Sequence, residues 1–142
     1  MKILHTTLNL LKKAGACGQK PDSGEGYDKL RQHLGKDWPK TKPIALLTVL
    51  ESNGVDDALW CLRATLPKEA NTRDRLARLY ACDCAERVLP IWERYAPDDK
   101  RPHRAIAVSR RYAEGLATAE ELDAARDAAN AAAEAARAAA WA

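Results

Sequence analysis

The chain holds three pairs of acidic side chains that could act as general acids and bases. The pairs are Asp56 with Asp57, Asp83 with Glu86, and Asp98 with Asp99. A helix start accounts for the first pair and a turn for the third, because carboxylates are favoured at both. The second pair lies on one predicted helix face near Arg87, so we interpret it as an ion-paired or solvated strip. None of the three pairs indicates catalysis.

Histidines and cysteines lack the spacing of a nucleophile motif or a metal site. They are His5, His33, His103, Cys17, Cys61, Cys82 and Cys84. Cys82 and Cys84 lie two apart on a predicted helix, so they point in different directions and do not share one metal ion. We expect reduced, buried thiols, with a zinc site from Cys17, one of that pair and a histidine as the alternative. No phosphate loop or dinucleotide fingerprint is present, so the sequence predicts a protein that is not an enzyme and needs no cofactor and no metal ion.

Charge is distributed unevenly within a formal net charge of +3. Residues 1–50 are basic and residues 119–142 are acidic, which predicts a charged protein partner, with direct nucleic-acid binding as the alternative. In the basic loop 36–43, Trp38 either closes over the edge of the core or is an exposed anchor for a partner. The candidate partner-binding residues are Trp38, Lys36, Lys40, Lys42, Arg104, Arg110 and Arg111.

The element that must position these residues is a long apolar stretch, residues 72–95. Its apolar residues leave no clean polar side at 100° per residue, which is typical of a helix enclosed by other elements. Pro90 is expected to kink or end this helix near Val88. We therefore predict an all-α fold, a compact single-domain bundle of about six to seven helices around this Pro-kinked central helix, whose first residue is capped by Asn71 or Thr72.

Shorter helices are predicted on both sides of the central helix. Capping residues, prolines and glycines set their ends. Their predicted ranges are 8–13 after a Thr6 or Thr7 cap, 25–34 before Gly35, 44–52 after Pro43, 56–65 before Pro67, and 102–113 before Gly115. At 44–52 a strand is the alternative, but Pro43 at the start and Gly54 at the end favour a helix.

The C-terminal segment is predicted to be one Ala-rich helix over residues 118–141. Thr118 and Glu121 have the spacing of a capping box, and alanine has the highest helix propensity. This helix either packs on its own domain or forms a seam for a homo-oligomer or partner. The domain prediction is one unit over 1–142, with a loop-rich basic part (1–43), a helical core (44–115) and this helix.

The apolar runs are too short to span a membrane. Lys12 and Lys13 fall where the apolar part of a signal peptide would lie, so we expect no signal peptide. The sequence therefore predicts a cytoplasmic protein without a membrane partner.

Three stretches resemble a known family. They are SNGVDDALWCLRA (52–64), YACDCAERVLPIWERYAPDDKRP (80–102) and YAEGLATAEELDAARDAA (112–129). Over residues 50–140 the chain resembles bacterial and phage proteins called putative immunity proteins, which are small, helical and cytoplasmic. The resemblance implies a protein that binds and blocks another protein. Two versions stay open: neutralisation of a toxin or nuclease, and phage-encoded inhibition of a host defence system, as anti-CRISPR proteins do.

Overall fold

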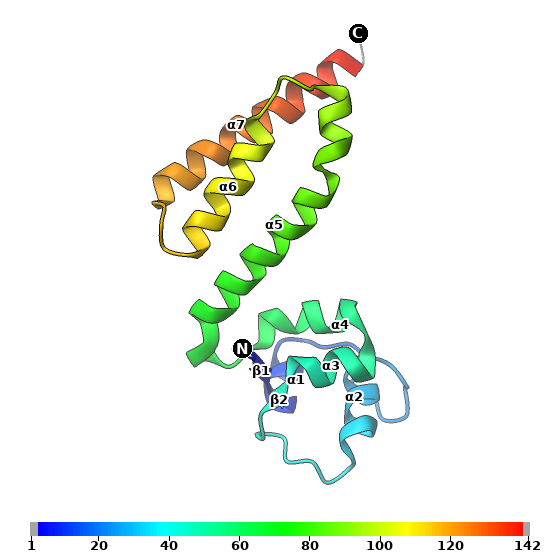
Figure 1. Ribbon diagram of the computed structural model, residues 1–142. Helices are drawn as coiled ribbons and strands as arrows, with labels where there is room; N and C mark the ends of the chain where they lie inside the picture. Colours follow the sequence, from blue (N-terminus) through cyan, green and yellow to red (C-terminus); the bar gives the residue numbers. More distant parts are fainter. Residues whose placement is uncertain (1–2, 141–142) are drawn as a thin grey trace. The chain divides into compact units, whose positions relative to one another are not determined.

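The computed structural model describes residues 3–140, with side chains up to residue 138. It confirms the predicted fold class: the described chain is mostly helical, with one two-stranded sheet (Figure 1). Its contacts divide it into two compact units, Met1–Arg73 and Asp74–Ala142, here called the N-terminal and the C-terminal unit. The prediction of one domain over 1–142 stays a prediction.

The N-terminal unit is built around an extended segment at the start of the chain. Strand β1 (His5–Thr6) pairs antiparallel with β2 (Ile44–Ala45). The Thr6 hydroxyl, fully buried, donates to the carbonyl of Ala64 at 2.6 Å. The backbone N–H of His5 donates to Glu69 at 2.7 Å. The start of the chain thereby joins segments about 40 and 60 residues away.

Helix α1 (Leu8–Lys13) and helix α2 (Gly26–Leu34) follow their predicted ranges. Thr7 caps α1, since its hydroxyl accepts the N–H of Leu10 at 3.1 Å. Gly35 follows α2 with a φ of 91°, a conformation that glycine adopts without strain. The start of α1 is therefore set by Thr7 and the end of α2 by Gly35, as the sequence predicted.

The next two helices begin differently from the prediction. Residues 44 and 45 form β2 rather than the first turn of a helix, so α3 spans Leu46–Asn53. The partner strand, forty residues away, supplies hydrogen bonds that a local pattern does not reveal. Helix α4 covers Val55–Trp60 and continues as a 3₁₀ helix, η1 (Cys61–Ala64). A second 3₁₀ helix, η2 (Pro67–Glu69), leads into the next element.

The main hydrophobic cluster of the described residues lies in the N-terminal unit. It combines residues of α1 and α2 with residues of β2, α3 and η1. Its buried members are Leu8, Leu11, Tyr27, Leu30, Ile44, Val49, Cys61 and Ala64. Burying each large aliphatic side chain contributes roughly 1.5–3 kcal/mol relative to exposure.

Helix α5 (Ala70–Tyr95) starts directly after η2, so neither Asn71 nor Thr72 is its cap. The helix continues through Pro90, which is exposed, so water can satisfy the carbonyl left without a donor. Its ribbon bends in the C-terminal half (Figure 1). Cys82 is the one buried residue of α5 among those described. The prediction that this helix is enclosed on all sides is therefore wrong: Val88 is 55% exposed and Ile91 61%.

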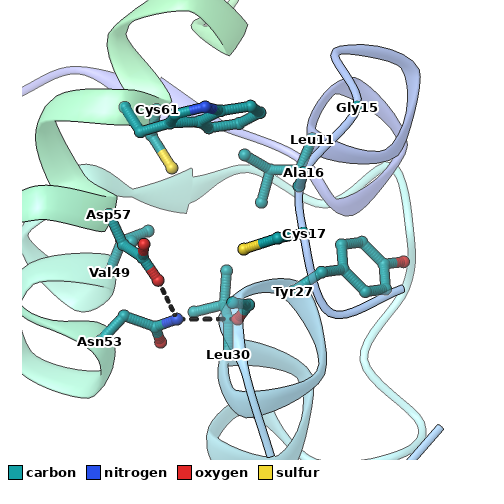
Figure 2. Close-up of a pocket in the computed structure, with 12 residues that line it drawn as sticks. Leu11, Gly15, Ala16, Cys17, Tyr27, Leu30, Val49, Asn53, Asp57 and Cys61 are labelled. Carbon is teal, nitrogen blue, oxygen red and sulfur yellow. Dashed lines mark hydrogen bonds between the residues drawn. The ribbon is translucent and has the colours of Figure 1, made fainter. Parts of the chain in front are cut away.

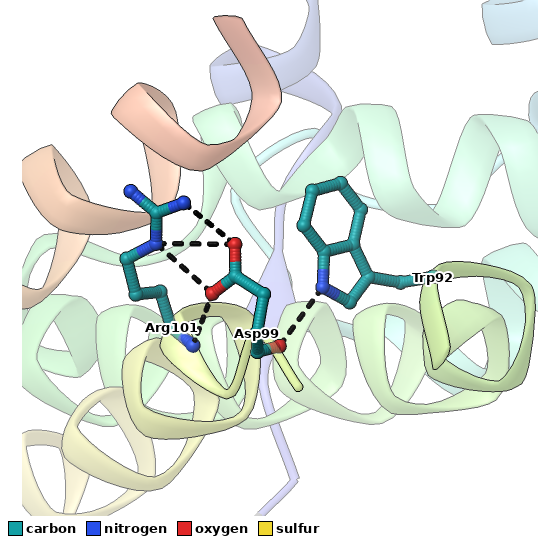
Figure 3. A network of polar contacts seen from close by, with 3 residues as sticks. All are labelled: Trp92, Asp99 and Arg101. Carbon is teal, nitrogen blue, oxygen red and sulfur yellow. Dashed lines mark hydrogen bonds and ion pairs between the residues drawn. The ribbon is translucent and has the colours of Figure 1, made fainter. Parts of the chain in front are cut away.

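Helix α6 (Arg101–Ala113) returns along α5 after a turn that is held by hydrogen bonds (Figure 3). The indole N–H of Trp92 donates to the backbone carbonyl of Asp99 at 3.0 Å. The guanidinium of Arg101 binds both carboxylate oxygens of Asp99, the shorter contact being 2.6 Å. These hydrogen bonds from Arg101 hold the pKa of the Asp99 carboxyl below its usual value.

Helix α7 (Ala119–Ala140) packs along α6 (Figure 1). The predicted capping box is present: the Glu121 N–H donates to the Thr118 hydroxyl, and the Thr118 N–H donates to the Glu121 carboxylate. Ala125 and Ala132 are its buried residues, so one face packs within the unit as predicted. An oligomer seam stays a prediction, and the predicted end at residue 141 lies outside the described residues. Over residues 3–140 no helix has both the length and the apolar character needed to cross a bilayer.

Candidate partner-binding groove

The basic loop of the N-terminal unit places two of its predicted residues in contact. Trp38 is half-buried and packs against the hydrophobic cluster. The Lys42 ammonium lies 4.0 Å from the centroid of its ring, a cation–π contact. Lys36 and Lys40 are exposed. Trp38 thus closes the edge of the core, and the partner-binding role of these four residues stays a prediction.

The second predicted cluster lies on α6 in the C-terminal unit. Arg110 donates to Asp83 at 2.7 Å and to Glu86 at 2.6 Å, which raises the pKa of its guanidinium. The acidic strip on α5 is therefore ion-paired as predicted, although its partner is Arg110 and not Arg87. Arg111 donates to the carbonyl of Leu116, while Arg104 is exposed. The hydrogen bonds of Arg110 to Asp83 and Glu86 therefore join α6 to α5.

A small pocket in the N-terminal unit brings two cysteines to one cavity of about 130 Å³ (Figure 2). Its lining is mostly apolar, with Asn53 at one edge donating to Asp57 and to the Gly26 carbonyl. Burial, aided by the charge of Asp57, raises the pKa of Cys61 to about 12. A thiol with that pKa is protonated and unreactive near neutral pH.

The prediction that all four thiols are buried is only half right. Cys61 and Cys82 are buried, whereas Cys17 and Cys84 are exposed. Within the described residues no three side chains of the metal-binding types gather into one cluster.

An open groove lies between α5 and the α6–α7 pair of the C-terminal unit. Three hollows of about 480, 330 and 510 Å³ follow one another along α5. The first two share Ala85 and Ile106, and the second and third share Val88 and Trp92, so they form one continuous depression. We call it the open groove.

Small and apolar side chains dominate the lining of the open groove. Those from α5 include Ala77, Ala81, Ala85, Val88, Trp92 and Tyr95; those from α6 and α7 include Ala105, Ile106, Leu122, Ala129 and Ala136. At its far end the Tyr95 hydroxyl donates to the backbone carbonyl of Ala136 at 2.9 Å, which ties α5 to α7. The walls are thus held by hydrogen bonds, while the space between them stays open.

The α5 side of the groove follows a regular spacing. Arg78, Ala81, Ala85, Val88, Trp92 and Tyr95 are separated by steps of 3, 4, 3, 4 and 3 residues. A mean step near 3.5 residues is the pattern of a helix that packs lengthwise against another helix. This spacing was visible in the sequence, but it was interpreted as part of an enclosed core, so the groove was missed.

The comparisons with known proteins define the class of the C-terminal unit. The Imm-5 like putative immunity protein family matches residues 68–142, more than half of the chain. The chain therefore belongs to this family, as the resemblance in the sequence suggested. Comparison with curated proteins gave no match, and comparison with solved structures gave none. The matched region contains the complete lining of the open groove.

Proposed function

We propose that the chain is a non-catalytic binding module that neutralises a toxin or nuclease by direct contact through the open groove. The observation that carries this proposal is the coincidence of the family match with the groove: both lie within residues 68–142. An immunity-type family implies a protein partner, and a protein partner requires a surface that fits it. As part of the proposal the module acts in the cytoplasm.

Exposed apolar side chains along α5 support a role in protein binding. Four large side chains of α5 are each about half or more exposed: Tyr80, Val88, Ile91 and Tyr95. Contiguous apolar surface of this kind is unusual on a monomeric protein and marks interaction sites. Because helices hold the surface in place, little conformational entropy is lost when the partner binds.

The absence of catalysis in the proposal is supported by the pairing of four carboxylates on α5 and in the turn that follows it. Asp83 and Glu86 pair with Arg110, Asp99 pairs with Arg101, and Glu93 contacts His103 at 2.9 Å. A carboxylate that acts as a general base must face the substrate. These four carboxylates instead contact side chains of their own unit.

A growth assay tests the proposal. Cells would express a candidate toxin, chosen among the proteins encoded next to this chain's gene by its ability to stop growth, together with the wild-type chain, the groove variant Ile91→Arg or the control variant Ala131→Arg. Ile91 lines the groove and Ala131 is exposed on α7 outside it. We expect wild type and Ala131→Arg to restore growth and Ile91→Arg to fail at equal protein level. Equal rescue by all three chains would refute the role of the groove, and no rescue by the wild type would refute the neutralising function.

A further inference from the structure

We propose that the open groove receives one amphipathic helix of the partner protein, apolar on one face and carrying carboxylates on both flanks. The inference deepens the proposed function and rests on it, since the helix belongs to the protein that the chain neutralises. It follows from three properties of the groove: its length and spacing, the size of its side chains, and the charges along its edges.

The length and spacing of the groove fit a helix. From Arg78 to Tyr95 the α5 wall spans about 26 Å at a rise of 1.5 Å per residue, close to five helical turns. The 3.5-residue step on this wall is the one that keeps two helices in contact over such a length. An extended peptide would instead require an unpaired strand edge or a polar backbone surface.

The side chains of the groove leave room for a helix backbone. Ala85 on α5 shares one hollow with Ala129 of α7, and Trp92 on α5 shares another with Ala136 of α7. Alanine at these places lets large apolar side chains of an incoming helix reach the floor. Val88 and Ile91, more than half exposed, lie at the open mouth, where such a helix would cover them.

Positive charge lines the α7 edge of the groove and flanks the exposed apolar stripe on α5, while one carboxylate, Asp74, also lines the groove. On α5, Arg87 lies four residues before Ile91 and Arg94 three residues after it, so both are neighbours of the exposed apolar stripe. On α7, Arg126 and Arg137 line the groove itself. We call these four residues the arginine rim.

Most of the arginine rim is unpaired. Arg126 pairs with Asp123 at 3.1 Å, within its own helix. Arg87 lines a separate hollow with Asp83 and Glu86, whose ion pairs go to Arg110. Among the side chains that the structure describes, no carboxylate forms an ion pair with Arg87, Arg94 or Arg137. Carboxylates on the flanks of an incoming helix would supply these partners.

The same rim argues against a second copy of this chain as the occupant. If two α5 helices packed against each other through this stripe in antiparallel orientation, Arg87 and Arg94 of one copy would face those of the other. Like charges at such flanking positions destabilise helix pairing. A partner with acidic flanks has no such conflict.

The test uses two designed helical peptides of about 21 residues as probes. In both peptides leucine occupies the positions that would face the groove. The positions that flank the leucines are all glutamate in one peptide and all lysine in the other. Binding to the full chain is measured by fluorescence anisotropy of the labelled peptide. We expect the glutamate peptide to bind at least about tenfold more tightly than the lysine peptide, and this preference to shrink at high salt.

Two variants of the chain separate the groove from other basic surfaces. In the triple variant Arg87→Glu, Arg94→Glu, Arg137→Glu the preference should reverse in favour of the lysine peptide. The control Lys100→Glu reverses an exposed lysine just before α6 that does not line the groove, so it should leave the preference unchanged. Bound glutamate peptide should also slow alkylation of Cys84, which lies beside Val88 on the exposed face of α5.

Several results would overturn the inference. They are equal binding of the two peptides, binding of neither, an unchanged preference in the triple variant, or concentration-dependent dimers of the chain that Ile91→Arg abolishes. If the growth assay shows neutralisation while any of these results is obtained, the proposed function stands and the acidic helix is refuted. If the peptide preference holds while the wild type gives no rescue, the groove chemistry stands and the neutralising function is refuted.

Discussion

Replacing Ala132 by leucine is expected to destabilise the C-terminal unit. Ala132 is 1% exposed, so the three added carbons meet a packed environment. Overpacking of this kind costs roughly 1–3 kcal/mol, and leucine is close to alanine in helix propensity. The effect must therefore come from packing and not from the helix itself.

The expected magnitude is about 2 kcal/mol, which corresponds to a decrease in Tm of about 8–16 °C for a unit of this size. The matched control is Ala131→Leu, the same change at the neighbouring position, which is exposed. It should leave the Tm within about 2 °C of the wild type.

The assay follows the buried thiol of each unit separately. Full-length protein is pulsed with an alkylating reagent at a series of temperatures, and mass spectrometry measures modification of Cys82 in the C-terminal unit and Cys61 in the N-terminal unit. The Cys82 midpoint should fall in Ala132→Leu while the Cys61 midpoint stays constant. If Ala132→Leu and Ala131→Leu give the same Cys82 midpoint, the packing of α7 described above is wrong.

Three further predictions concern single contacts. In the native chain an alkylating reagent near neutral pH should modify two thiols and spare two, as mass spectrometry would show; the modified ones are Cys17 and Cys84, and the spared ones Cys61 and Cys82. Burial alone would raise the pKa of Glu69, but hydrogen bonds from His5 outweigh burial and lower that pKa. The Glu69→Gln variant should therefore be less stable than the wild type in urea unfolding above pH 4.5. This difference in stability should shrink as the pH falls through the lowered pKa. Thr118→Ala should cost the C-terminal unit roughly 1 kcal/mol in the Cys82 assay, and Thr118→Ser should restore most of it; equal stability of the two variants would contradict the capping role.

Helix ends that depend on neighbouring residues could be predicted from the sequence. Thr7 caps α1, Gly35 ends α2, and Thr118 with Glu121 begins α7, as expected. In each of these a side chain or a glycine acts on a backbone group within a few residues, so the sequence contains the complete interaction.

Features that depend on distant segments could not be predicted. The sequence at Ile44 is compatible with a helix, and only its pairing with Thr6 makes it a strand. The partner of Asp83 and Glu86 was expected on the same helix at Arg87, whereas Arg110 on α6 supplies it. Non-local contacts of this kind leave no periodic signal in either segment.

The open groove shows why composition alone did not reveal the candidate site. An apolar face that binds a partner and an apolar face that packs in a core have the same residue types and the same spacing. The apolar residues of 72–95 were therefore predicted to be enclosed by other helices. The structure separates the two interpretations because Val88 is 55% exposed.

Hydrogen exchange of the full chain, with and without the purified candidate toxin from the growth assay, tests most directly that the chain acts through the open groove. We expect slower exchange of backbone amides in residues 77–95 and 119–138 when that protein is bound, with unchanged exchange in α1 and α2. Protection confined to residues 3–69, or no protection in α5 despite binding, would contradict it.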